Sequence, residues 1–574
     1  MRILRKITFN DESIIEVGED DIIVLVGPNN VGKSRTLKDI GELCYGAVST
    51  TIVVNSIELD SLDSSAIETE LAKHCDTQSV DESTKIYSGY RFKSSSDMVK
   101  MFVQDNADLS DLAYFFVCQS DTERRLDITR PSDNIATLGR ESDPIHHLAH
   151  DKEALDRLNR YFYDSFHERV YPDILTPSHM PLVIGKKPQL DGDYDSEYHR
   201  AAALGELFQK YAKAHDQGDG IRSFLGVAMD LMADQFRLYL LDEPEAFLHP
   251  PQATKIGHLI AKTTVGRAQV VISTHSKDLI LGLLQEDPSR IKIFRMTREG
   301  SSNKLSSINS DELLDIWNKP ILRHSDILDC LFHDSSVVCE SDSDIMLYSA
   351  MLAHIDQDLA LRTKFVQAGG KERLRDIAAI LKNLSVPFIV IPDIDIMNNE
   401  QSFRNLVESC GGVWSDIEHD EKVVVGQIAG QSSKAIRREE IQRILDAANA
   451  ELDTKTLKEL HEAIKIPSKW SDAKRYGKIV FRGEAAASYA AIDVYCKAVG
   501  IFIVPEGELE SFLPDVSAKH GGSWATEALT RYPNLGNPRY DRLKAFVDSW
   551  RDQLSNQNCS DAENNRLENT EDEN

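Results

Sequence analysis

The sequence predicts an α/β protein with two successive parallel-sheet domains, over residues 1–325 and 333–550. In both stretches short apolar segments alternate with amphipathic helical segments, which is the pattern that parallel sheets produce. The chain of 574 residues is too long for one hydrophobic core, so two or three domains are expected. It has no run of about 18 apolar residues, so no membrane span is predicted.

Charge and cysteine content limit the class of protein further. A net charge of −28 argues against a protein that simply coats DNA, but it is compatible with a metal-dependent enzyme that carries a local basic patch. The eight cysteines are scattered, which argues for a reducing cytoplasm and against a zinc site. The N-terminus lacks the apolar core of a signal peptide, and the acidic segment 555–574 predicts a disordered tail.

The first domain is predicted to contain two regions, at about 55–110 and about 145–215, that interrupt its alternation of strands and helices. The apolar segment "DIIVLVG" predicts a strand before a helix that begins near Ser34. A polar, Ser/Asp-rich region at about 55–110 predicts surface loops or an inserted arm, and "LAYFFVC" (112–118) predicts a strand. Helical patterns dominate the region at about 145–215.

A phosphate-binding loop follows the first buried strand. The segment "GPNNVGKS" fits G-x-x-x-x-G-K-S between a strand and a helix, which is the context that this motif requires. Its glycines allow backbone amides to close around phosphates, its lysine reaches the β- and γ-phosphates, and its serine holds Mg²⁺. We therefore predict ATP bound with Mg²⁺ at Gly27, Pro28, Asn29, Asn30, Val31, Gly32, Lys33 and Ser34.

The segment "LYLLDEPEAFLHP" supplies the other half of a nucleotide site. After four apolar strand residues, Asp242 is placed to bind Mg²⁺ through water, and Glu243 is placed to polarise the attacking water. The segment "VVISTHS" places His275 at the end of the next strand, where an imidazole can sense the γ-phosphate. A histidine after a strand is structural in most proteins, but its spacing from "DEP" favours the functional interpretation.

These motifs resemble those of ABC-type ATPases of the RecF/SMC branch. The segment "GDGIRSFLGVAMDL" stands where that family has its signature motif but lacks "SGG", and Gly220, Arg222 and Ser223 are its candidate residues. The resemblance implies that this segment reaches the nucleotide of another subunit, and hence a homo-oligomer, either a dimer or a tetramer. The family's nucleotide-contacting glutamine is predicted at Gln119, with Gln104 as the rival.

Three predicted strands of the second domain end in acidic residues. "SSVVCESDSD" gives Glu340 and Asp344, "FIVIPDIDIMNN" gives Asp393 and Asp395, and "GIFIVPEGELESF" gives Glu508 and Glu510. The carboxyl ends of parallel strands converge on one crevice. A carboxylate after a strand is often only a helix cap, but several together require cations, and oxygen ligands select Mg²⁺ or Mn²⁺. Two such ions about 4 Å apart would form a clamp for attack on a phosphodiester.

This constellation, with "QAGGKERL" (367–374), resembles the Toprim domain of OLD-family (overcoming lysogenisation defect) proteins. An N-terminal ABC ATPase followed by a Toprim domain is that family's layout. The resemblance implies that the six carboxylates are metal ligands and that a lysine stabilises the transition state. Lys519 is the predicted lysine, Lys544 is the second choice, and Lys371 contacts a phosphate or caps a helix. The fold class is thus an α/β ABC-type P-loop ATPase domain followed by a Rossmann-like Toprim domain with a helical insertion at about 430–465.

The resemblance implies an ATP-regulated, metal-dependent endonuclease that acts in bacterial defence against phage, with DNA as the expected substrate. A possible operon partner is a retron reverse transcriptase with its msDNA. The alternatives are a RecF/SMC-like DNA-binding scaffold without nuclease activity, or a ribonuclease acting on tRNA. Basic residues that could contact nucleic acid concentrate in three stretches, 124–130, 434–440 and 468–483, and a solvated charged surface is an equally good interpretation of the last.

Overall fold

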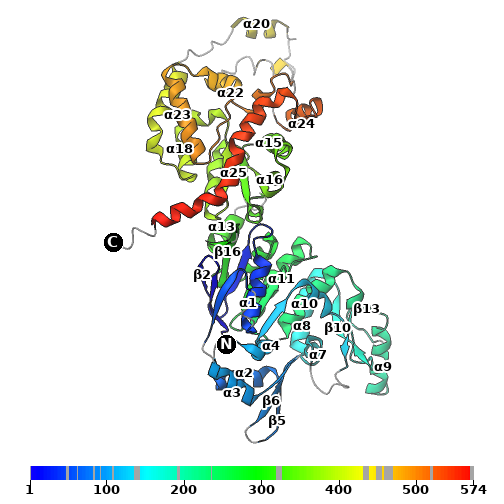
Figure 1. The fold of residues 1–574 in the computed structure, drawn as a ribbon. Coiled ribbons are helices and arrows are strands. Elements are labelled where there is room, and N and C mark those ends of the chain that lie inside the picture. Colours follow the sequence, from blue (N-terminus) through cyan, green and yellow to red (C-terminus); the bar gives the residue numbers. More distant parts are fainter. Residues whose placement is uncertain are drawn as a thin grey trace. The chain divides into compact units, whose positions relative to one another are not determined.

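The computed structural model describes most of the chain: residues 2–46, 51–60, 63–81, 84–90, 92–105, 109–134, 142–190, 194–233, 235–300, 302–318, 326–430, 438–447, 456–457, 460, 469–516 and 521–568. It divides into two compact units, Met1–His324 and Ser325–Asn574. Figure 1 draws the first unit in blue to green and the second in green to red. Among the described residues, no helix is both long and apolar enough to cross a membrane.

The first unit is built around a six-stranded sheet whose strand order is β17-β16-β3-β15-β14-β8. All neighbouring pairs are parallel except β16 and β17. The central strand β3 is buried at every residue, as expected for a strand covered on both faces. The strands are β3 (Ile22–Val26), β8 (Val117–Ser120), β14 (Leu238–Asp242), β15 (Gln269–Ser273), β16 (Ile291–Glu299) and β17 (Ser302–Ile308). A second, antiparallel sheet contains β1 (Leu4–Phe9), β2 (Ile14–Glu16) and β4 (Val54–Leu59).

Helices connect the strand ends of this sheet. Helix α1 directly follows the loop after β3, and α10 precedes β14. Helix α11 lies between β14 and β15 in the chain and packs closely on α12, where Gly257 and Gly282 allow the two backbones to approach. The helices are α1 (Lys33–Cys44), α10 (Asp219–Met232), α11 (Pro250–Thr264) and α12 (Lys277–Leu284).

The two regions of the first unit that separate its sheet-forming segments, at about 55–110 and about 145–215, both have regular secondary structure. The polar region at about 55–110 is folded: a three-stranded antiparallel sheet, β5-β6-β7, lies between two helices in the chain. Its elements are α2 (Ser64–His74), β5 (Asp76–Ser79), β6 (Lys85–Ser88), β7 (Lys93–Ser95) and α3 (Ser96–Asp105). The region at about 145–215 is mixed, with helices α7 (Pro144–His150), α8 (Lys152–Phe166) and α9 (Glu197–Phe208) beside a sheet of β10 (Arg169–Pro172), β12 (Leu182–Gly185) and β13 (Ala212–Lys213).

The prediction of a strand over 112–118 was wrong in position. The structure forms a short helix α4 (Ala113–Phe116), and the strand β8 begins only at Val117. Ala113, Phe115 and Phe116 are buried in the core of the first unit. An apolar run alone cannot distinguish a buried helical turn from a buried strand, so tertiary packing decided the local conformation.

The second unit contains a three-stranded parallel sheet in the order β19-β18-β20. Its strands are β18 (Ser335–Cys339), β19 (Thr363–Gln367) and β20 (Phe388–Ile391). The predicted strand "GIFIVP" runs alongside β20. Val390 N–H donates to the Gly500 carbonyl at 2.8 Å, and Phe502 N–H donates to the Val390 carbonyl at 2.8 Å. It forms a single parallel bridge with β20, so its end lies beside the end of that strand.

Helices surround this sheet. They include α15 (Asp342–Ile355), α17 (Leu374–Asn383), α18 (Glu400–Ser409), α19 (Glu418–Ala429), α22 (Ser471–Tyr476), α23 (Glu484–Ala498) and α24 (Gly522–Arg531). The red helix α25 (Asp541–Glu568) packs on α15 (Figure 1). Buried residues such as Trp550 anchor this helix. The disordered tail predicted over 555–574 stays a prediction, and its residues 569–574 lie outside the described part of the chain. Of the predicted insertion, α20 (Arg438–Ala447) is described, and most of the remainder lies outside the described residues.

Candidate functional site

The phosphate-binding loop of the first unit has a backbone that depends on glycine. Gly27 and Gly32 have φ of 139° and 98°, and a side chain on Gly27 would overlap the Met296 carbonyl oxygen. From the antiparallel strand β17, the Asn303 side chain donates to the Val31 carbonyl, which ties the loop to that strand. No sequence motif indicated this support, because Asn303 and Val31 are 272 positions apart in the chain.

Lys33 lies inside the loop. Its ammonium donates to the Gly27 carbonyl at 2.8 Å and to the Pro28 carbonyl at 2.7 Å. Burial lowers the pKa of Lys33 to about 8, although the nearby carboxylates of Glu243 and Asp242 oppose that shift. A bound phosphate would compete for this ammonium, so the side chain is positioned for the role that the motif predicts.

The acidic residues Asp242 and Glu243 at the end of β14 and the histidine after β15 lie near Lys33 of this loop. The Ser273 hydroxyl donates to Asp242 Oδ1, and Glu243 N–H donates to the Ser273 carbonyl at 2.9 Å, with Glu243 held at φ 45°. His275 Nε2 lies 3.7 Å from Glu243 Oε1. Burial, together with the charge of Lys33, lowers the pKa of His275 to about 4, so its imidazole is neutral at pH 7.

Arg125 connects three parts of this site and was missed as a functional residue. It is fully buried, and it donates to the main-chain carbonyls of Ser120 at 3.0 Å, Asp242 at 2.7 Å and Glu243 at 3.0 Å. Its Nε also reaches the Ser223 hydroxyl on α10 at 3.4 Å. The guanidinium therefore links the end of β8, the acidic turn after β14 and the signature segment.

The remaining candidates for nucleotide contact in the first unit are Gly220, Arg222, Ser223, Gln119 and Gln104. Ser223 is fully buried, whereas Gly220 lies at the start of α10, where an added side chain would contact the Phe247 carbonyl at 2.8 Å. Arg222 donates to the Leu126 carbonyl at 2.8 Å. Gln119 lies within β8 with its side chain against Gly41, which is about 10 Å along α1 from Ser34 by helical rise. The side chain of Gln104 lies outside the described residues.

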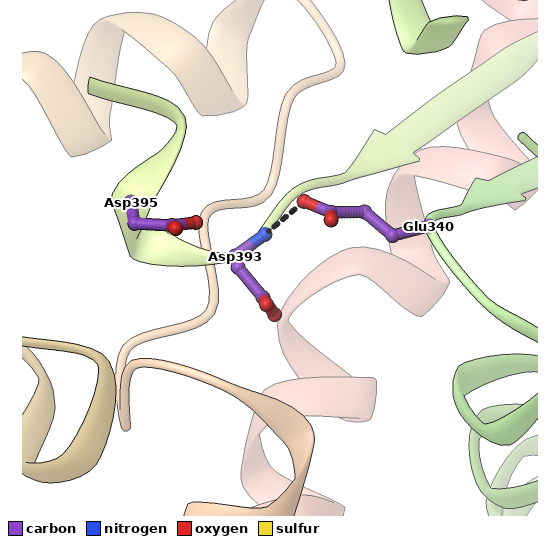
Figure 2. A group of neighbouring side chains, drawn as sticks. All are labelled: Glu340, Asp393 and Asp395. Atoms are coloured by element: carbon purple, nitrogen blue, oxygen red, sulfur yellow. Dashed lines mark hydrogen bonds between the residues drawn. The ribbon is translucent and has the colours of Figure 1, made fainter. Parts of the chain in front are cut away.

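In the second unit, the ends of two neighbouring strands bring three carboxylates together. Glu340 follows β18, and Asp393 and Asp395 follow β20. One oxygen from each of the three side chains lies within 4.8 Å of the others. Figure 2 shows Glu340 and Asp395 pointing toward one another across the Asp393 backbone, and Asp393 N–H donates to Glu340 Oε1 at 3.0 Å.

Burial makes this carboxylate group costly in its charged form. It raises the pKa of Glu340 to about 7, despite the hydrogen bond from Asp393, and it raises the pKa of Asp393 well above the ordinary value, with the Glu340 carboxylate adding to the effect. Asp395 Oδ1 is buried and accepts no hydrogen bond within the described part of the chain. A group of this kind is stabilised by binding a proton or a cation.

The other three predicted metal ligands are Asp344, Glu508 and Glu510, and they are not among the three carboxylates that lie within 4.8 Å of one another. Burial raises the pKa of Asp344 to about 6, and its Oδ2 accepts the Ser341 N–H at 2.9 Å in a capping box at the start of α15. The Glu510 carboxylate adds to that shift. Glu508 Oε2 lies 3.4 Å from an ammonium that also contacts Asp393, so it faces the same centre.

That ammonium belongs to Lys474, which the sequence placed only in a basic stretch. Its Nζ lies 3.0 Å from Asp393 Oδ2 and 3.7 Å from Asp395 Oδ2. Burial alone would lower the pKa of Lys474, but the charges of Asp393 and Asp395 outweigh it and raise the pKa. Lys371, after the Gly-Gly turn, also lies 3.3 Å from Asp395 Oδ2. The predicted Lys519 lies outside the described residues, and Lys544 is exposed on α25.

The basic stretches are used within the fold only in part, because Lys469, Arg475, Lys478 and Arg482 of 468–483 are exposed. In 124–130, Arg124 pairs with the buried Asp230 at 2.9 Å, and Arg125 is buried, so these two cations do not face solvent together. In 468–483, Trp470 and Phe481 are buried core residues rather than stacking platforms. Side chains of 434–440 lie outside the described residues.

Two family models match the chain, one in each unit. Residues 115–282 match the family described as "AAA domain, putative AbiEii toxin, Type IV TA system". Residues 331–395 match the family described as "Overcoming lysogenization defect protein-like, TOPRIM domain". The chain therefore contains an AAA-type P-loop ATPase domain followed by an OLD-like TOPRIM domain, which are the domains of an ATPase and of a nuclease.

The remaining comparisons are with curated sequences and with solved structures. None of the curated sequences compared matches the chain. Similar structures include an SMC head bound to the C-terminal winged-helix domain of ScpA, at 11% identity and a TM-score of 0.32, covering 54% of this chain and 99% of that one. The SMC head domain from Thermotoga maritima is similar at 12% identity and a TM-score of 0.29, with the same coverage. The protein cbiO1 from Clostridium perfringens, part of the ABC transporter complex cbiONQ, is similar at 11% identity and a TM-score of 0.26, covering 56% of this chain and 92% of that one.

Proposed function

We propose that the chain is an ATP-regulated, divalent-metal-dependent endonuclease whose catalytic centre contains Glu340, Asp393 and Asp395. The observation that carries this proposal is the convergence of three carboxylates within 4.8 Å in the OLD-like TOPRIM domain, with a buried Asp395 oxygen that has no hydrogen-bond donor among the described residues. Oxygen-only ligands with ligand-sized spacing fit Mg²⁺ or Mn²⁺.

The residues of this centre have different roles in the proposed cleavage. A divalent cation bound there supplies Lewis acidity toward a phosphodiester and makes water a stronger nucleophile. Glu340 is oriented by the Asp393 N–H at 3.0 Å, so its carboxylate is fixed before a cation binds. Lys371 is placed near Asp395, where its ammonium can attract the phosphate backbone of a substrate. Asp344 and Glu510 supply further carboxylates to the same centre.

The ATPase site is proposed to regulate this centre. Lys33 and Ser34 would hold the phosphates and Mg²⁺ of ATP, Asp242 would bind the same Mg²⁺, and Glu243 would orient the attacking water. The neutral His275 beside Glu243 is suited to sensing the γ-phosphate. Nucleotide binding and hydrolysis would then control access of nucleic acid to the carboxylate centre.

The substrate proposed is DNA, bound by a homo-oligomer in which the signature segment of one subunit reaches the nucleotide of another. A role in defence against phage, with an operon partner such as a retron reverse transcriptase and its msDNA, rests on the OLD-like resemblance alone. The alternatives differ in an observable way. A DNA-binding scaffold would cleave nothing, and a ribonuclease would cleave tRNA in preference to DNA.

The test is a cleavage assay with the purified full chain. Supercoiled plasmid, single-stranded DNA and tRNA would each be incubated with Mg²⁺ or Mn²⁺, with and without ATP. Nicking or linearisation of plasmid that requires the cation is the expected result, and the ATP lanes give the direction of regulation. Cleavage of tRNA alone would transfer the proposal to RNA, and the absence of cleavage in every lane would favour the scaffold.

Cation affinity at the carboxylate centre is expected to increase with pH up to about 7. Glu340, with a pKa of about 7, and Asp344, with a pKa of about 6, retain protons below these values, and a cation must displace them. Since both pKa values are raised by folding, the metal-free native state binds more protons than the unfolded state. Its free energy of unfolding therefore falls as pH rises from about 4 to about 7.

The measurement is thermal unfolding of the nucleotide-free chain at pH 5.5 and 7.5, with and without Mn²⁺. The stabilisation by Mn²⁺ is expected to be larger at pH 7.5. The Asp393→Ala variant serves as the control that lacks a ligand. Equal stabilisation at both pH values in the wild type would contradict the assignment of protonated carboxylates to the metal centre.

A further inference from the structure

We propose that the Lys474 ammonium is a built-in cation of the carboxylate centre and occupies one of two cation positions. The centre would then bind a single divalent ion in its resting state, on the side of Glu340, in place of the two ions that the sequence predicts. This inference rests on the proposed metal-dependent function, because it concerns how that same centre is filled.

The position of the ammonium carries the argument. Lys474 Nζ contacts carboxylates from two separate chain segments: Asp393 at 3.0 Å and Asp395 at 3.7 Å after β20, and Glu508 at 3.4 Å after the extended segment 501–504. Contact with several converging carboxylates is the environment that a bound cation has. The side chain is about two-thirds buried, at 33% exposed, so it does not belong to the solvated surface.

The backbone around Lys474 is fixed by close packing. A side chain on Gly507 would overlap the Lys474 carbonyl oxygen, and a side chain on Gly477 would overlap the Pro505 carbonyl oxygen. Both glycines have positive φ, at 108° and 67°, so the chain approaches here in a conformation that favours glycine. The Ser511 hydroxyl also donates to the Lys474 carbonyl at 3.1 Å. The lysine is therefore anchored to the segment that carries Glu508.

The two sides of the centre differ in charge. On one side, Asp395 Oδ2 faces both Lys474 at 3.7 Å and Lys371 at 3.3 Å, so a divalent ion there would meet two ammonium groups. On the other side, Asp395 Oδ1 is buried and receives no hydrogen bond from the described residues. Glu340 and Asp395 each offer one oxygen to the group whose oxygens lie within 4.8 Å of one another. One divalent ion fits the second side without displacing an ammonium.

The experiment counts Mn²⁺ bound to the full nucleotide-free chain by calorimetric titration and electron paramagnetic resonance. Binding to the Asp393→Ala variant is subtracted, so that only ions at this centre are counted. The expected result is one Mn²⁺ per wild-type chain with no spin-coupled pair. Lys474→Met is expected to raise the count to two, with a coupled Mn²⁺ pair about 4 Å apart, because removal of the ammonium frees the second position.

Two further variants keep the result interpretable. Lys474→Arg retains the charge and is expected to bind one ion, and Lys478→Met removes an exposed charge from the same segment and is also expected to bind one. Two ions in the wild type, or one in both the wild type and Lys474→Met, would overturn this inference and leave the proposed metal centre intact. No Mn²⁺ in the wild type would overturn the metal centre itself, and the wild-type count is decisive even if Lys474→Met does not fold.

Discussion

Replacement of Asp393 by alanine is expected to reduce phosphodiester cleavage by roughly 10³-fold or more while leaving ATP binding unchanged. Asp393 is central to the carboxylate group, because its N–H orients Glu340 at 3.0 Å and its side chain faces Lys474 at 3.0 Å. The nucleotide site belongs to the other compact unit, Met1–His324, so it should not be affected. The measurement is the initial rate of plasmid nicking in Mn²⁺, together with the dissociation constant of a fluorescent ATP analogue.

The matched control for Asp393 is Asp376→Ala, which removes an exposed carboxylate from α17 in the same unit. It is expected to cleave at the wild-type rate. Asp393→Asn retains the shape of the side chain and removes its charge, so it separates the need for a charged ligand from the need for a hydrogen-bonding group. Cleavage at the wild-type rate by Asp393→Ala would show that the chemistry takes place elsewhere.

Replacement of Glu243 by glutamine is expected to reduce ATP hydrolysis by roughly 10²–10⁴-fold while ATP still binds. The glutamine cannot accept the proton of the attacking water, but it retains the size of the side chain. Glu243 is positioned by a 2.9 Å hydrogen bond from its N–H to the Ser273 carbonyl and by its contact with His275 at 3.7 Å. Phosphate release and nucleotide binding would be measured on the same preparation.

Two comparisons isolate the role of Glu243. Glu153→Gln changes an exposed glutamate on α8 and is expected to hydrolyse ATP normally. Lys33→Ala removes the ammonium inside the phosphate-binding loop and is expected to lose binding as well as hydrolysis. If Glu243→Gln lost nucleotide binding to the same degree as Lys33→Ala, Glu243 would be a binding residue and not the group that activates water.

Local patterns in the sequence were sufficient to predict the polar and charged residues that lie together at strand ends. The segment "GPNNVGKS" follows the buried strand β3, and the segment "LLDEP" contains the end of the buried strand β14. The structure brings Lys33, Asp242, Glu243 and His275 together. In the second unit, Glu340, Asp393 and Asp395 converge for the same reason: parallel neighbours in a sheet end at one edge. Periodicity and turn residues therefore predicted the α/β fold and the side chains that the structure brings together at these strand ends, and their functional roles stay predictions.

Residues that act through distant contacts were not predictable in this way. Arg125 was placed in a basic stretch, but its buried guanidinium holds the carbonyl groups of Asp242 and Glu243. Lys474 precedes Glu508 by 34 positions, and no spacing rule connects a short helix to the ends of two strands. An apolar run at 112–118 also predicted a strand where packing produced a helix.

The sequence by itself determined which residues could bind phosphate and cations, because those requirements are local: glycines in a loop, a lysine before a helix and carboxylates after buried strands. Only the tertiary structure decided which ammonium faces the carboxylates and which oxygens remain without a donor. Charge balance in a buried site is set by distances between segments far apart in the chain, and the energy of a carboxylate there depends on burial and on every neighbouring charge. These quantities exist only after the chain has folded.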